Sequence, residues 1–105
     1  MTFQSGETNK AVLSGFTIQN GVASDWGGGI IITNSSPIVE NNVVRWNEAV
    51  NYHGGGVFIH GVNSSPKIRN NTIIENKAQT SGGGIDLDDN STATITKNII
   101  KNIAF

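Results

Sequence analysis

The sequence predicts a single all-β domain in which the chain winds through about four coils of short parallel strands. Three observations predict it: a repeat of 27–28 residues, a strand-like alternation of apolar side chains within each repeat, and an abundance of turn residues. The 105 residues include 13 Gly and 14 Asn, and both residue types tolerate the positive φ angles that tight turns require. A chain of this composition must reverse direction often.

A Gly-Gly-Gly triplet followed by an aliphatic residue marks the start of three copies of the repeat. The triplets begin at Gly27, Gly54 and Gly82, so their spacings are 27 and 28 residues. A second motif, Asn-Ser-Ser-Pro, begins at Asn34 and again at Asn63. Self-similarity at such a period is typical of solenoids, in which each repeat forms one coil. We place the coils within the single segment 1–105 at residues 2–26, 27–53, 54–81 and 82–105.

The apolar residues of each copy follow the period-two pattern of a strand with one buried face. In the segments 30–33, 57–60 and 85–88 the first and third residues are aliphatic, whereas the second and fourth vary. Equivalent strands of successive coils are expected to pair in parallel about 4.8 Å apart, which stacks their aliphatic side chains in rows inside the coil. The predicted inner rows are Ile30/Val57/Ile85, Ile32/Ile59/Leu87, Leu13/Val39/Ile68/Ile95 and Ile18/Val44/Ile73/Ile100.

Asparagines recur at equivalent turns of successive copies. Their side-chain amides are expected to stack and to hydrogen-bond to the next coil as ladders. The two predicted ladders are Asn42/Asn71/Asn98 and Asn47/Asn76/Asn102.

These motifs carry a family resemblance. Gly-Gly-Gly-Ile followed by Asn-Ser-Ser-Pro-x-Ile-x-Asn-Asn-x-Ile resembles the repeats of the pectate-lyase-like superfamily, and so does the segment 13–21. The resemblance covers nearly the whole chain and implies a right-handed parallel β-helix with three short strands per coil. It also favours an extracellular or cell-surface location. Because that superfamily includes lyases, hydrolases, epimerases, adhesins and phage tailspikes, the resemblance does not select an activity.

Composition excludes several classes of partner and site. The formal net charge is −1 and the seven Lys and Arg are scattered, so we predict neither nucleic-acid nor membrane binding. The absence of Cys excludes a disulfide framework and Cys-ligated metal sites. Purely apolar runs such as 30–32 are far too short to span a bilayer.

Outward positions of the strands that follow the triplets hold the candidate binding residues. One outward row has Phe58 next to Asp86, and the next row places His60 beside Asp88, with Asp89 in the following turn. A His with carboxylates could bind a divalent cation or perform acid–base chemistry, and carboxylates on the outer face resemble the calcium sites of pectate lyases. The interpretation we favour is that these acidic residues solvate an exposed strand, with no metal and no cofactor; Ca²⁺ is the ion considered as an alternative.

Catalysis is predicted to be absent. Polygalacturonase-type hydrolases carry an Asp-Asp and a His-Gly pair, similar to Asp88-Asp89 and His60-Gly61 here. In that family, however, the Asp-Asp pair comes first, and its Asn-Thr-Asp and Arg-Ile-Lys motifs are missing from this chain. A lyase needs a basic residue near its metal, whereas Arg69 is expected to pair with Glu40 on the previous coil.

Outward apolar side chains point to a partner. Ile31 and Phe58 form an adjacent apolar pair, and Phe105 could lie over the end of the core. Four coils make a stub only about 19 Å tall, with open strand edges at both ends, so we expect self-association through the coil ends or through the Ile31/Phe58 face.

Aromatic side chains at turns offer a second kind of partner. Trp26, Trp46 and Tyr52 could stack on sugar faces or anchor a protein interface, and we favour a packing partner over a polysaccharide. The predicted function is therefore a non-catalytic structural or binding module of a surface β-helix protein. The alternative is a polysaccharide lyase or glycoside hydrolase of the pectate-lyase-like type.

Overall fold

The computed structural model describes the backbone of residues 1–80 and 82–104. Side chains are described for residues 1–80 and 82–101. The described residues form strands and turns without a helix, so they contain no helix long and apolar enough to cross a membrane. The strands are β1 (Thr2–Phe3), β2 (Val12–Ser14), β3 (Thr17–Gln19), β4 (Val22–Ala23), β5 (Ile30–Thr33), β6 (Ile38–Glu40), β7 (Val43–Arg45), β8 (Glu48–Ala49), β9 (Val57–His60), β10 (Lys67–Arg69), β11 (Thr72–Ala78), β12 (Ile85–Asp88), β13 (Thr94–Thr96) and β14 (Ile99–Ala104).

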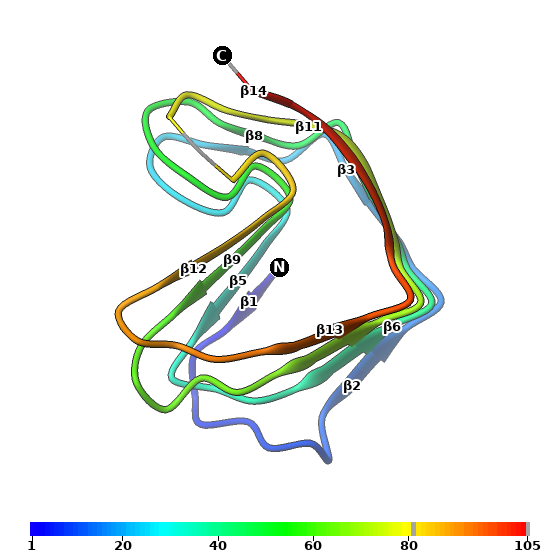
Figure 1. Cartoon of the computed structure of the whole chain (residues 1–105), viewed down its shortest axis with the longest axis vertical. Coiled ribbons are helices and arrows are strands. Elements are labelled where there is room, and N and C mark those ends of the chain that lie inside the picture. Colours follow the sequence, from blue (N-terminus) through cyan, green and yellow to red (C-terminus); the bar gives the residue numbers. More distant parts are fainter. Residues whose placement is uncertain (81, 105) are drawn as a thin grey trace.

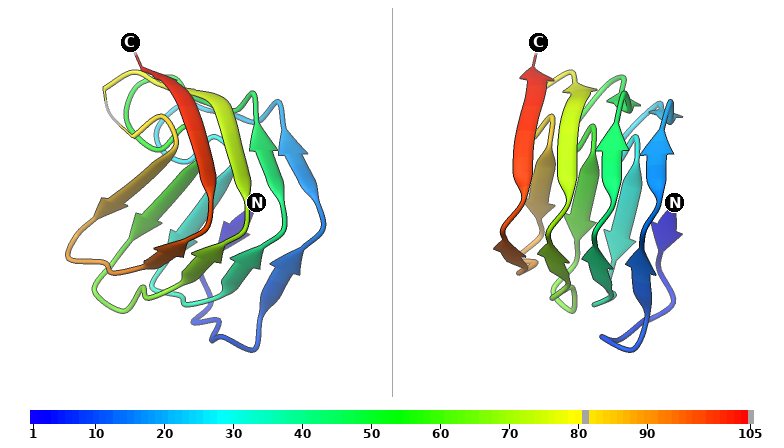
Figure 2. Two further views of the ribbon diagram at one scale, coloured as in Figure 1. Left: turned by 45° about the vertical axis from the view of Figure 1, so that its right-hand side comes forward. Right: turned by 90° about the vertical axis from the view of Figure 1, so that its right-hand side faces the viewer.

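The strands form three parallel sheets that make the faces of a solenoid of about four coils. Sheet A has the order β1-β5-β9-β12, and sheet B the order β13-β10-β6-β2. Sheet C has the order β3-β7-β11-β8-β4, with β14 paired to β11. Viewed along the coil axis, equivalent strands superimpose (Figure 1), and from the side they stand next to one another (Figure 2). The all-β solenoid predicted from the repeat is confirmed.

The pairing register places every predicted inner row as expected. Val39, for example, lies opposite Leu13 on one side and Ile68 on the other. Inner-row side chains of the second and third coils are only 0–1 % exposed. They are Ile30, Ile32, Val39, Val44, Val57, Ile59, Ile68 and Ile73. The core is therefore a stack of aliphatic layers, and complete burial requires a coil on both sides.

The last coil shows what happens when one neighbour is missing. Leu87, Ile95 and Ile100 continue the inner rows, yet they are 38–45 % exposed. Their side chains point to the interior of the coil but have no further layer above them among the described residues. Phe105, which we considered as a cover for this end, lies outside the described residues.

Asparagine ladders hold the turns between coils. The Asn71 side-chain nitrogen donates to the Val39 carbonyl oxygen at 2.9 Å and to Asn98 Oδ1 at 3.1 Å. In the second ladder, Asn47 Nδ2 donates to Asn76 Oδ1 at 2.9 Å. Both ladders are formed as predicted as far as they are described, and the side chain of Asn102 lies outside that part. The amides of Asn42, Asn47, Asn71 and Asn76 are buried, and they satisfy backbone groups that the bend would otherwise leave unpaired.

The glycine triplets turn the chain from sheet C into sheet A. Gly54 has φ 70°, in the left-handed region that favours glycine. A Cβ added to Gly56 would lie 2.6 Å from the Gly84 carbonyl oxygen of the next coil, so no side chain fits there. The triplets thus make tight corners, and they bring the loops before them back alongside sheet A (Figure 1).

Candidate functional site

A cleft of about 700 Å³ lies on the outer side of sheet A. One wall is the segment 22–26, here called the Trp26 loop, which contains β4 and leads into the first glycine triplet. The other wall is the outward row of β5, β9 and β12. Its lining side chains are Ile31, Thr33, Phe58, His60 and Asp88. The cleft exists because the strand-to-strand corner before Gly27 carries the loop outward and then back over the sheet.

Aromatic rings form a continuous stack along this cleft. The Trp26 ring stacks on Tyr52, with centroids 5.1 Å apart, and on Phe58 at 5.9 Å. Phe58 in turn stacks on the His60 ring at 5.8 Å. Trp26 and Tyr52 remain 41 % and 44 % exposed, so the stack still presents ring surface to solvent.

The expectation that Phe58 is an exposed contact residue was wrong. Phe58 lies beside Ile31 in the outward row, as predicted, but it is only 5 % exposed. The reason is the Trp26 loop, whose indole covers the phenyl ring. The apolar pair is therefore packed largely against its own chain.

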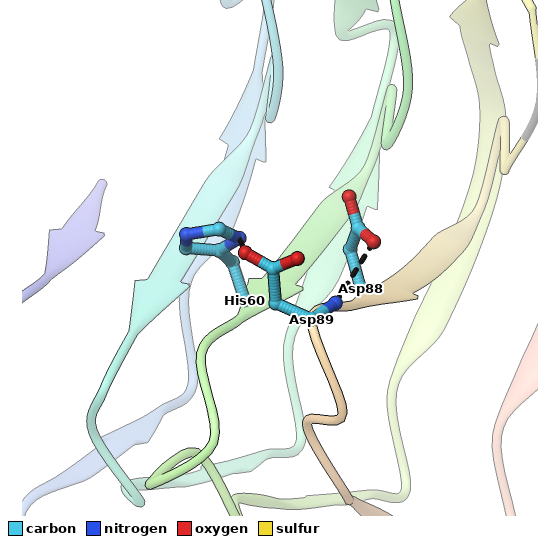
Figure 3. Close-up of side chains that lie close together, drawn as sticks. All are labelled: His60, Asp88 and Asp89. Carbon is cyan, nitrogen blue, oxygen red and sulfur yellow. Dashed lines mark hydrogen bonds and ion pairs between the residues drawn. The ribbon is translucent and has the colours of Figure 1, made fainter.

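Three of the four predicted binding residues come together at one end of the cleft. Asp88 pairs with His60 in the sheet register, and His60 Nδ1 lies 3.2 Å from Asp89 Oδ2 (Figure 3). Ligand atoms of all three residues lie within 4.8 Å of one another. This is a set that could hold a divalent cation, with one imidazole and two carboxylates.

The hydrogen bonding within this cluster is incomplete. His60 Nδ1 is inaccessible to solvent and makes no hydrogen bond, although it lies close to the Asp89 carboxylate. Asp88 Oδ1 accepts a hydrogen bond from the Asp89 backbone N–H at 2.8 Å (Figure 3). The turn after β12 thus fixes Asp89 across from the imidazole.

Asp86, the fourth predicted residue, belongs to a different contact. Its carboxylate lies 3.6 Å from His53 Nδ1, and Thr80 Oγ1 lies 2.8 Å from that same nitrogen. The pKa of Asp86 is raised, chiefly because burial disfavours the charged carboxylate. The neighbouring His53 and a hydrogen bond from the Leu87 backbone lower the pKa, whereas the charge of Asp88 raises it. Sequence reasoning missed His53 because it lies in a loop, outside the strand rows.

The basic residues expected near a lyase metal lie on other faces. Arg69 Nε donates to Glu40 Oε1 at 2.8 Å on sheet B, which confirms the predicted pair. On sheet C the Arg45 guanidinium lies 4.1 Å from the Trp46 ring centroid, and the Trp46 indole N–H donates to Glu75 at 2.7 Å. Trp46 is thus an exposed aromatic residue outside the cleft.

Comparisons with known proteins address the fold. A family model described as the right-handed β-helix region matches residues 2–105. No curated protein and no solved structure matches the chain.

Proposed function

Because the chain belongs to the right-handed β-helix family, whose fold by itself does not specify an activity, we propose that it is a non-catalytic module that binds a polysaccharide in the cleft on sheet A. The observation that carries the proposal is the exposed Trp26–Tyr52 stack beside a cleft of about 700 Å³. This volume falls within the usual range for ligand sites, roughly 300–1,000 Å³.

The chemistry of the cleft suits a sugar better than a protein surface. Exposed aromatic ring faces can pack against the C–H face of a pyranose, and the nearby carboxylates and imidazole can accept or donate hydrogen bonds to hydroxyl groups. Because Phe58 is covered by Trp26, the outer face offers less apolar area to a packing partner than the sequence indicated. We therefore favour a polysaccharide over a protein packing partner, which is the reverse of the preference drawn from the sequence.

The positions of charged residues support binding without catalysis. No Lys or Arg lines the described walls of the cleft, so a lyase would lack its usual base there. Asp88 and Asp89 are adjacent in the chain and gather with His60 on one side. A glycoside hydrolase instead needs two carboxyl groups that flank the scissile bond, roughly 5–9.5 Å apart.

One observation favours a hydrolase as the second candidate. Asp25 and Asp88 belong to opposite walls of the cleft, which is the general placement that acid and base carboxyl groups require. Assays for new reducing ends and for unsaturated products, on the same polymers used for binding, separate the two candidates. The proposal predicts neither product, and either one would replace it with an enzymatic function.

The binding test compares the two tryptophans. We expect Trp26→Ala to weaken affinity for a bound oligosaccharide about tenfold in calorimetry, the order expected for one lost aromatic stack. Trp46→Ala is the matched control, because Trp46 is similarly exposed at 47 % but lies between β7 and β8, outside the cleft. Equal losses in the two variants, or no binding across a panel of neutral, anionic and cationic oligosaccharides, would contradict the proposal.

A further inference from the structure

The charged side chains of this protein are segregated by face. All four Asp of the chain lie on the sheet A side: Asp25 in the Trp26 loop, Asp86 and Asp88 in β12, and Asp89 in the next turn. No Lys or Arg occurs in the strands of sheet A or in the Trp26 loop. The basic residues are Lys10, Arg45, Lys67, Arg69, Lys77, Lys97 and Lys101.

This segregation makes the cleft far more acidic than the net charge indicates. The formal side-chain charge of the whole chain is −1. The four Asp contribute −4, and the seven basic residues with the four Glu leave +3 for the other faces. The acidic side chains that line the described walls of the cleft, Asp25 and Asp88, have no Lys or Arg beside them in that lining, so the lining favours a cationic ligand.

Two of these carboxylates face the ligand directly. Asp25 and Asp88 line the cleft, from opposite walls, whereas Asp89 is engaged with His60 and Asp86 with His53. A polymer of uronic acids carries a carboxylate on each sugar, so it would bring like charges together in a partly desolvated site. A cationic sugar would gain attraction from both walls.

Aromatic rings add to the preference for a cation. Trp26 lines the cleft together with Asp88 and is 41 % exposed, and an ammonium group near the exposed part of a tryptophan ring is attracted by the ring's quadrupole. A pyranose that bears an amine combines the two requirements of this site, an apolar face for the indole and a positive charge for the carboxylates.

We propose, building on the polysaccharide-binding function above, that the cleft selects a polymer of amino sugars with free ammonium groups. Asp25 and Asp88 pair with ammonium groups of the polymer, and Trp26 packs against a sugar ring. A basic peptide would satisfy the carboxylates but would lack the flat pyranose face that the exposed indole fits.

The experiment uses matched oligosaccharides and the intact chain. Calorimetry compares a β-1,4-linked glucosamine hexamer with its fully N-acetylated counterpart and with a galacturonate hexamer, at a pH where the amine is protonated and the carboxylates are ionised. We expect the glucosamine hexamer to bind at least about tenfold more tightly than the N-acetylated hexamer, and the preference to shrink as salt screens the charges. The galacturonate hexamer is expected to bind most weakly.

Two double variants carry the same change in net charge. Asp25→Asn with Asp88→Asn should abolish the preference for the glucosamine hexamer over the N-acetylated hexamer, because it removes the charges that attract the ammonium groups. Glu48→Gln with Glu75→Gln, on sheet C, should leave the preference intact. Equal loss in both double variants would mean that only the net charge matters, and would overturn the inference.

The remaining outcomes distinguish this inference from the function on which it rests. If none of the hexamers binds, the polysaccharide-binding function itself fails. If the hexamers bind without preference, or galacturonate binds best, that function stands and the amino-sugar inference fails. If hexalysine binds as tightly as the glucosamine hexamer and is unaffected by Trp26→Ala, the cleft is a site for basic peptides and the inference is wrong.

Discussion

The inside of the coil and the outer face of sheet A are built from alternate residues of the same strands, yet only the inside repeats. The inward position of β5, β9 and β12 reads Ile32, Ile59 and Leu87, whereas the neighbouring outward position reads Thr33, His60 and Asp88. Packing between coils constrains the first set to aliphatic side chains. The second set is free of that constraint, so its side chains can differ from coil to coil, and the proposed binding cleft lies over them.

The largest effect is expected from a charge placed in the repeating interior. Ile68→Asp should unfold the chain, because it buries an unpaired carboxylate within a stack where Ile68 is fully covered, at a cost of several kcal/mol. Asp86→Ile, on the outward row, should keep the fold. Circular dichroism checks both; a folded Ile68→Asp variant together with an unfolded Asp86→Ile variant would reverse the inside and outside of the strands.

A smaller loss is expected from breaking one ladder. Asn71→Ala removes hydrogen bonds to the Val39 carbonyl and to Asn98, and it leaves the Asn42 backbone N–H without its acceptor. We expect the free energy of unfolding to fall by about 2–4 kcal/mol, since buried groups left unpaired cost roughly 1–3 kcal/mol each. The control Asn63→Ala, at an exposed turn, should cost under about 0.5 kcal/mol. Urea titrations that give equal losses would contradict the role assigned to the ladder.

The exposed end of the interior gives a prediction about assembly. We propose that the chain self-associates, because Leu87, Ile95 and Ile100 belong to the inner rows and are 38–45 % exposed, and exposed strand edges recruit other strands. Light scattering at micromolar concentration should give a particle larger than 11.1 kDa, and Ile100→Lys should reduce its size. A wild-type monomer with a cooperative thermal transition would contradict the proposed self-association.

The smallest effect is expected on the pH dependence of stability, through Asp86 on the outer face of sheet A. Because the pKa of Asp86 is raised in the folded chain, its ionisation is less favourable there than in the unfolded chain. Stability should therefore decline as the pH rises from the unfolded value of 3.8 through the raised folded pKa. In Asp86→Asn this decline should be diminished. Thermal melts across that range check the sign, and a decline that is steeper in the variant would refute it.

The repeat was sufficient to predict the interior but not the cleft. Parallel pairing follows from the period and the alternation alone. These two features were therefore enough to predict the row Leu13/Val39/Ile68/Ile95 and the pairs His60–Asp88 and Arg69–Glu40. The cleft depends on how the Trp26 loop returns over sheet A. Residues 22–26 belong to none of the repeat motifs found in the sequence, so the covering of Phe58 by Trp26 was missed. The contact of Asp86 with His53 was missed because His53 lies outside the predicted strand rows.

The most direct test of the central claim, that recognition resides on the non-repeating outer face, is the fluorescence of single-tryptophan variants. Trp46→Phe leaves Trp26 as the reporter in the cleft, and Trp26→Phe leaves Trp46 on sheet C. Titration with the glucosamine hexamer should produce a saturable change in emission from Trp26 and none from Trp46. A saturable change from Trp46 alone, or no change from either residue, would contradict the account.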